Sequence, residues 1–132
     1  MNLLVCKGQI KMIITEYMTI EEIMNCLTDE YGDNFNWRMI PLTDKYFAAE
    51  LKRELKPGDP FLMNDIHAVA KCDSDDNVLY LGIDGTGTKE IWRIYHLTYA
   101  SDNVSGYPLF KEFGSRKTVA DYIQNQFVSE YL

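Results

Sequence analysis

A pair of glycines, Gly85 and Gly87, has the spacing that begins a phosphate-binding loop. A dinucleotide fingerprint also needs a third glycine and a helix whose N-terminus holds the phosphate. Glu90 stands in the third place, and a β-branched and aromatic run follows it. We therefore interpret the pair as the turn of a β-hairpin, in which glycine adopts the positive φ that the turn requires.

The acidic segment 73–77, Asp-Ser-Asp-Asp-Asn, could supply the first three oxygen ligands of a calcium-binding loop. Val78 occupies the place where such a loop needs glycine, and Asp84 the place of its bidentate glutamate. The alternative is a solvated turn whose side chains hydrogen-bond their own backbone, and we prefer it.

His67 and His96 are the two histidines of the chain. They fall on predicted strands that a third strand separates, roughly 9 to 10 Å apart, which disfavours joint metal ligation. His96 could act as a base near neutral pH, but spacing assigns it neither a nucleophile nor an orienting carboxylate. The alternative is a half-buried histidine that hydrogen-bonds within the sheet.

The cysteines, Cys6, Cys26 and Cys72, are odd in number, far apart and without a Cys-x-x-Cys spacing. This pattern predicts neither a disulfide framework nor a zinc site, and it is typical of a reducing cytoplasm. Lys7 and Lys11 interrupt the apolar opening, so no signal peptide is predicted. We expect a cytoplasmic protein with no metal and no other cofactor.

Length and charge restrict the classes of protein further. The 132 residues fit a single α+β domain over 1–132; a start at Met12 is an open alternative that would make 1–11 a dispensable arm. The formal charge is −7, which disfavours nucleic acid and anionic membranes and would attract a basic protein. Acidity that merely maintains solubility is the alternative.

Helical periodicity marks three segments. Thr19 and Glu22 form a capping box that begins a helix ending at Gly32. Thr43 or Asp44 caps a second helix, which ends before 57–58, and Ser115 caps a third. The apolar stripe of the third helix is Val119, Tyr122, Ile123, Phe127 and Tyr131.

Between the helices the apolar period changes to two. The segments 66–72, 78–83 and 90–99 are expected to form an antiparallel meander, with short edge strands at 37–40 and 109–113. The inward set of the middle strand is expected to be Leu79, Leu81 and Ile83. The fold class is therefore α+β, an antiparallel meander sheet with helices before and after it packed on one face.

The strand 90–99 is apolar on both faces, and only one face can meet the helices. The other is either covered by the terminal arm and loops or exposed as an aromatic surface for a partner. The candidate partner-binding residues are Trp92, His96, Tyr80, Asp73, Asp75 and Asp76.

Residues 68–80, 95–99 and 50–55 resemble an uncharacterised group of small bacterial cytosolic proteins, over about 40–100 of this chain. The resemblance implies no activity. More loosely, Leu-Gly-Ile-Asp-Gly-Thr-Gly at 81–87, within this order of elements, is similar to the SUKH superfamily, whose members include immunity proteins that neutralise secreted bacterial toxins.

Two hypotheses about function follow. The first is a non-enzymatic module that binds a basic protein through its acidic surface and exposed aromatic side chains. The resemblance to the SUKH superfamily implies that this module is a toxin-immunity protein. The second is a small-ligand-binding protein or hydrolase with His96 in a pocket between sheet and helices. A deep pocket that holds His96 and a carboxylate would favour the second, and a shallow acidic face the first.

Overall fold

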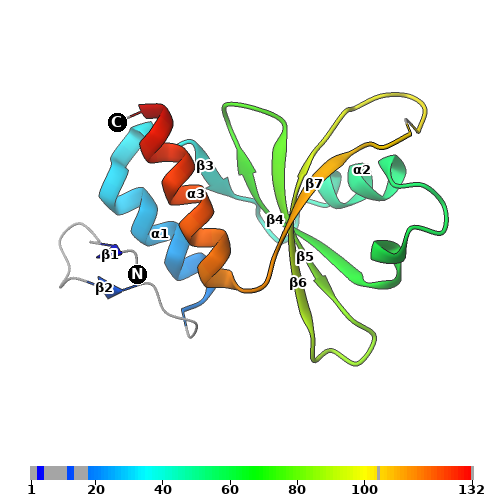
Figure 1. Ribbon diagram of the computed structural model, residues 1–132, viewed down its shortest axis with the longest axis horizontal. Helices are drawn as coiled ribbons and strands as arrows, with labels where there is room; N and C mark the ends of the chain where they lie inside the picture. The colour runs from blue at the N-terminus through cyan, green and yellow to red at the C-terminus, as the bar shows by residue number, and fades with distance from the viewer. Residues whose placement is uncertain (1–2, 5–11, 14–17, 104, 132) are drawn as a thin grey trace. The chain divides into compact units, whose positions relative to one another are not determined.

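The computed structural model describes residues 3–4, 12–13, 18–103 and 105–131. One helix precedes a five-stranded antiparallel sheet, a second lies between its first two strands and a third follows it, which confirms the α+β class (Figure 1). Contacts divide the chain into two compact units, Met1–Trp37 with Gly114–Leu132, and Arg38–Phe113. The predicted single domain spans both units, and we describe each unit by itself. No helix in the described ranges is long and apolar enough to cross a bilayer.

The first unit contains α1 (Ile20–Tyr31), a 3-10 turn η1 (Gly32–Asn34), α3 (Arg116–Tyr131) and the two-residue strands β1 (Leu3–Leu4) and β2 (Met12–Ile13). The predicted capping box is present. The Glu22 amide donates to Thr19 Oγ1, and the Thr19 amide donates to Glu22 Oε1, each at 3.1 Å. Most of the predicted arm 1–11 lies outside the described residues.

An aromatic cluster joins the two helices of this unit. The ring of Phe127 on α3 lies 4.7 Å from that of Tyr31 and 5.6 Å from that of Phe35. Val119 and Ile123 are buried beside it on the predicted stripe, whereas Tyr122 is only partly buried. The side chain of Tyr131 lies outside the described set.

The second unit is built on the sheet, whose strands run in the order β3-β4-β5-β6-β7. Their bounds are β3 (Trp37–Met39), β4 (Asp65–Cys72), β5 (Asn77–Ile83), β6 (Glu90–His96) and β7 (Leu109–Phe113). The short strands β3 and β7 are the two edges, as predicted. The prediction that the third meander strand reaches residue 99 is wrong, because the chain leaves the sheet after His96.

A bulge in β4 corrects the expected alternation. Ala68 pairs with Tyr80 while Ala70 pairs with Leu79, so the extra residue Val69 exchanges the two faces. The expected single inward set on β5 is also wrong, because side chains on both faces of this strand are buried. Leu79 is fully buried, but Leu81 and Ile83 are only partly buried, and Val78 and Tyr80 are buried on the opposite face.

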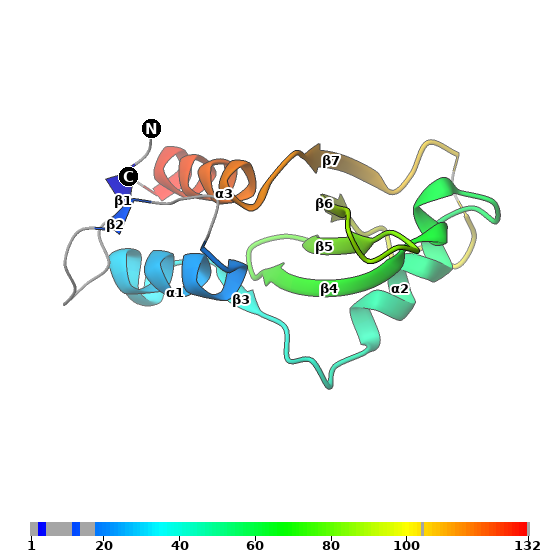
Figure 2. The ribbon, with the colours of Figure 1, turned by 90° about the horizontal axis from the view of Figure 1, so that it is seen from below.

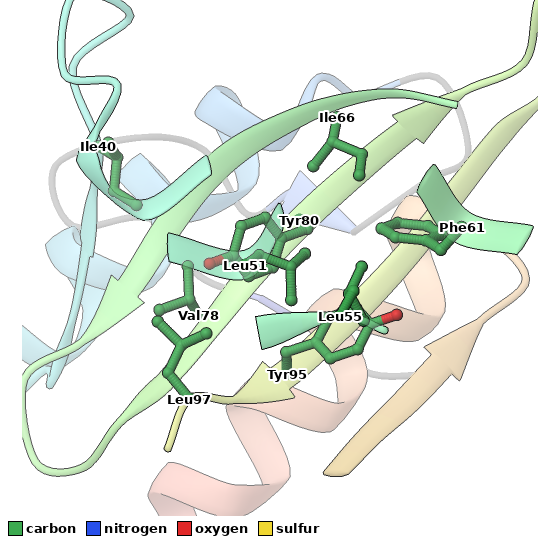
Figure 3. Close-up of a cluster of buried hydrophobic side chains, with 9 residues drawn as sticks. All are labelled: Ile40, Leu51, Leu55, Phe61, Ile66, Val78, Tyr80, Tyr95 and Leu97. Carbon is green, nitrogen blue, oxygen red and sulfur yellow. The ribbon is translucent and has the colours of Figure 1, made fainter. Parts of the chain in front are cut away.

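The face that carries Val78 and Tyr80 packs against α2 (Tyr46–Glu54) and the 3-10 turn η2 (Pro60–Met63), seen from below in Figure 2. Figure 3 shows the side chains that converge there. They are Ile40, Leu51, Leu55, Phe61, Ile66, Val78, Tyr80, Tyr95 and Leu97. The N-cap of α2 is Lys45 and not Thr43 or Asp44 as predicted, but Asp44, the residue before it, accepts at Oδ1 from the Tyr46 amide at 3.0 Å.

Cys72 is buried and not disulfide-bonded, and desolvation raises the pKa of its thiol. Cys26 is buried in α1 and disulfide-bonded, so the prediction that the cysteines form no disulfide is wrong for Cys26. Cys6 lies outside the described residues.

Candidate functional site

His96 and the acidic turn 73–76 come together at one end of the sheet. The strand register places Asn77 opposite His96, and His96 opposite Leu109. The Nδ1 atom of His96 lies 2.9 Å from Asn77 Oδ1 on an exposed surface. Asn77 follows the turn directly, so the predicted histidine and aspartates share one rim of the sheet.

Trp92 and Tyr80 do not join this rim. Their exposed fractions are 2% and 0%, so neither is available to hold a partner, which corrects the prediction of an aromatic surface built from them. They lie on opposite faces of the sheet, and both faces are covered at these positions. Tyr80 donates its phenolic hydrogen to the Phe47 carbonyl at 2.7 Å, and burial raises its pKa.

The three aspartates of the turn have different surroundings. Asp73 accepts from Arg38 Nε at 2.9 Å, an exposed ion pair that offsets its charge. Asp75 Oδ1 accepts from the Asn77 amide at 2.8 Å and shapes the turn, as an Asx motif does. Asp76 is also exposed, and its charge acts on a nearby tyrosine.

That tyrosine is Tyr99, which together with Tyr46 supplies the exposed aromatic rings that sequence reasoning missed. Their exposed fractions are 39% and 57%. Desolvation, followed by the negative charges of Asp76, Glu50 and Glu54, raises the pKa of Tyr99 to about 12. Two exposed rings thus lie among carboxylates. We call Tyr46, Glu50, Asp76 and Tyr99 the acidic aromatic surface.

Glu54 fixes the corner that presents Tyr99. Its carboxylate accepts from the Thr98 amide at 2.7 Å, the Thr98 hydroxyl at 2.8 Å and the Tyr99 amide at 3.0 Å. Tyr99 itself has φ +55°, a left-handed conformation that is rare for a bulky residue. Asn103 Nδ2 donates to the Glu54 carbonyl at 2.7 Å and so ties the following loop to the end of α2.

The surroundings of Glu50 and Glu54 shift the pKa values of these two carboxyl groups in opposite directions. Desolvation raises the pKa of Glu54, but the carboxyl of Glu50 and the donors on Thr98 and Tyr99 outweigh it, and the net shift is downward. The hydrogen bond from Arg53 lowers the pKa of Glu50, yet desolvation and Glu54 outweigh that effect. Glu54 therefore holds its negative charge more firmly than Glu50.

Two hollows lie elsewhere on this unit. A groove of about 400 Å³ lies between α2 and the start of β4 and includes His67, Asp65 and Lys52 in its lining. A smaller hollow of about 240 Å³ lies beyond the C-terminal end of α2. His96 lines neither of them. Over the described ranges, no three His, Cys, Asp or Glu side chains gather as a metal site would require.

The comparisons with known proteins give no relative: no family model, curated protein or solved structure matches this chain. The resemblance to the uncharacterised bacterial group and to the SUKH superfamily therefore stays a prediction.

Proposed function

We propose that this chain is a non-enzymatic binding module that holds a basic segment of another protein on the acidic aromatic surface. The observation that carries the proposal is the pair of exposed rings, Tyr46 and Tyr99, among the charges of Asp76, Glu50 and Glu54. Aromatic faces and carboxylates both attract guanidinium and ammonium groups.

The charge balance supports a cationic partner. Arg53 pairs with both Glu50 and Glu54, which leaves Asp76 as the carboxylate of this group that Arg53 does not offset, and the whole chain carries −7. A field of one sign accelerates the encounter with an oppositely charged partner and weakens as salt rises. Desolvated rings near the centre of a contact then slow dissociation.

Preorganisation also supports binding over catalysis. The three hydrogen bonds to Glu54 hold Thr98 and Tyr99 in one conformation before any partner arrives. A surface fixed in this way loses less entropy on binding. The hydrolase alternative needs His96 in a pocket with a carboxylate, whereas His96 is exposed and its Nδ1 atom meets the amide oxygen of Asn77.

The resemblance to immunity proteins makes a basic bacterial toxin the first class of partner to test. An immunity protein of this kind would act in the cytoplasm. Disulfides are rare in a reducing cytoplasm, so the disulfide at Cys26 is evidence against that location. Counting free thiols in the denatured protein, purified with its thiols blocked at lysis, tests that location directly.

The binding proposal is tested by selecting ligands from a random-peptide display library and measuring their affinities by titration calorimetry. We expect the selected peptides to be rich in Lys and Arg. Asp76→Lys should weaken binding about tenfold or more, and the loss should shrink as ionic strength rises.

Glu90→Lys is the matched control, because it makes the same change in net charge within the second unit, at the exposed start of β6, roughly 20 Å along the strand from the end that meets the acidic turn. It should change affinity by less than about threefold, as expected for a charge beyond the screening length. Selected peptides without basic residues, or an equal effect of both substitutions, would show that the acidic aromatic surface is not the binding site.

A further inference from the structure

The smaller hollow at the C-terminal end of α2 has an unusual aromatic lining. Four of its lining residues carry rings. Tyr95 and Pro108 are buried, whereas Tyr107 and Phe110 are 47% and 52% exposed. Two charged residues, Lys56 and Asp59, also line this hollow. We call these six residues the aromatic hollow. Its volume of about 240 Å³ is below that of typical drug-sized sites, so it fits a side chain rather than a cofactor.

The exposed ring of Phe110 is held in place by an arginine. Arg93 lies with its guanidinium carbon 4.1 Å from the ring centre of Phe110 and 4.5 Å from that of Phe61. Its Nε donates to Glu112 at 2.9 Å and its Nη1 donates to the Tyr95 hydroxyl at 2.6 Å. The edge strand β7 therefore presents the large apolar ring of Phe110. The Arg93 guanidinium stacks on this ring and keeps it from turning inward.

We propose that the aromatic hollow binds a proline-containing, extended segment of a basic partner. Polyproline II segments have no internal hydrogen bonds and present rigid apolar rings, and grooves lined by aromatic side chains recognise them at low entropic cost. Phe110 and Tyr107 offer the ring faces. The Tyr107 hydroxyl and the Lys56 ammonium offer donors for the unpaired carbonyl groups of such a segment.

The positions and charges of the two surfaces indicate which residues neighbour the prolines in this partner segment. The C-terminal end of α2 joins both surfaces, because Glu54 holds Tyr99 while Leu55 and Lys56 line the aromatic hollow. A segment with prolines on the hollow would carry its neighbouring residues toward the acidic aromatic surface, where Lys or Arg is favoured. The inference thus rests on the proposed function and adds the conformation of the partner segment.

The test titrates the full chain with two synthetic peptides, an oligoproline that ends in arginines and a Gly-Ser peptide of equal length with the same arginines. We expect the oligoproline to bind about tenfold more tightly. Phe110→Ala and Tyr107→Ala should each remove most of that difference, as truncation of an aromatic anchor does. Both side chains are half-exposed, so both variants are expected to fold.

Leu109→Ala is the matched control, because Leu109 is 55% exposed but lies on the opposite face of β7. It should leave the preference for proline unchanged. Equal binding of the two peptides would overturn the inference and leave the proposed function standing, provided that Asp76→Lys weakens both. If neither peptide binds, both proposals fail. A preference for proline that survives Phe110→Ala and Tyr107→Ala, or is lost in Leu109→Ala, would refute the aromatic hollow as the site.

Discussion

Removal of the Glu54 carboxylate is expected to destabilise the second unit strongly. The side chain is 3% exposed and accepts three hydrogen bonds from Thr98 and Tyr99. Hydrogen bonds to a charged group contribute about 1.5–3 kcal/mol each, but they are not additive within one network. Deleting one side of a buried charged network costs about 3–5 kcal/mol, which we expect for Glu54→Ala.

Glu54→Gln preserves the shape and one acceptor oxygen. Oε1 can still accept both bonds from Thr98, whereas an amide group in place of Oε2 would face the Tyr99 amide donor to donor. We expect a cost of about 1–3 kcal/mol, the price of one unsatisfied buried donor. The order of stability should therefore be wild type, then Glu54→Gln, then Glu54→Ala.

The difference in stability between wild type and Glu54→Gln should depend on pH and should be smaller in acid. The folded-state pKa of Glu54 lies below its ordinary value of 4.5, so its ionised form stabilises the fold. That contribution is fully present above the ordinary pKa and is lost as pH falls through the lowered folded-state pKa. The gap between wild type and Glu54→Gln should be constant near neutral pH and should narrow in acid.

Urea unfolding followed by tryptophan fluorescence, to which Trp92 in the same unit contributes together with Trp37, measures these differences. With a slope of about 1.5–2 kcal/mol/M, a loss of 3–4 kcal/mol lowers the midpoint by about 2 M. Glu112→Gln is the control, because Glu112 is half-exposed and makes one ion pair, which predicts a loss below about 1 kcal/mol. If Glu54→Ala costs no more than Glu112→Gln, the argument for the buried clamp is refuted.

Three further substitutions test the packing. Tyr80→Phe removes the buried hydrogen bond to the Phe47 carbonyl and should cost about 1 kcal/mol in urea unfolding; no loss would show that the bond contributes nothing. Gly82→Ala would place a Cβ 2.8 Å from Phe61 Cε1, so we expect a loss of about 1–3 kcal/mol, and a neutral result would mean that the Phe61 ring moves freely. Thr19→Ala removes the N-cap of α1 and should lower thermal stability by about 0.5–2 kcal/mol, whereas an unchanged melting temperature would contradict the capping box.

Local patterns determined the elements of this protein. The capping box at Thr19 marked the start of α1, and the alternation of apolar residues marked β4, β5 and β6 to within a few residues. These signals are readable because a helix repeats every 3.6 residues and a strand every two. The antiparallel pairing of β5 with β6, which places His96 opposite Asn77 beside the acidic turn, agrees with the predicted meander.

Only the tertiary structure decided which aromatic side chains are exposed. Trp92 and Tyr80 have the same local pattern as surface-strand aromatics, but they are covered from opposite faces, whereas Tyr99 emerges because β6 stops at His96. The stop depends on Glu54, which is 44 residues from Thr98 in the chain. Sequence periodicity reports which side chains share a face, but burial of that face and the ending of a strand depend on contacts between residues far apart in the sequence.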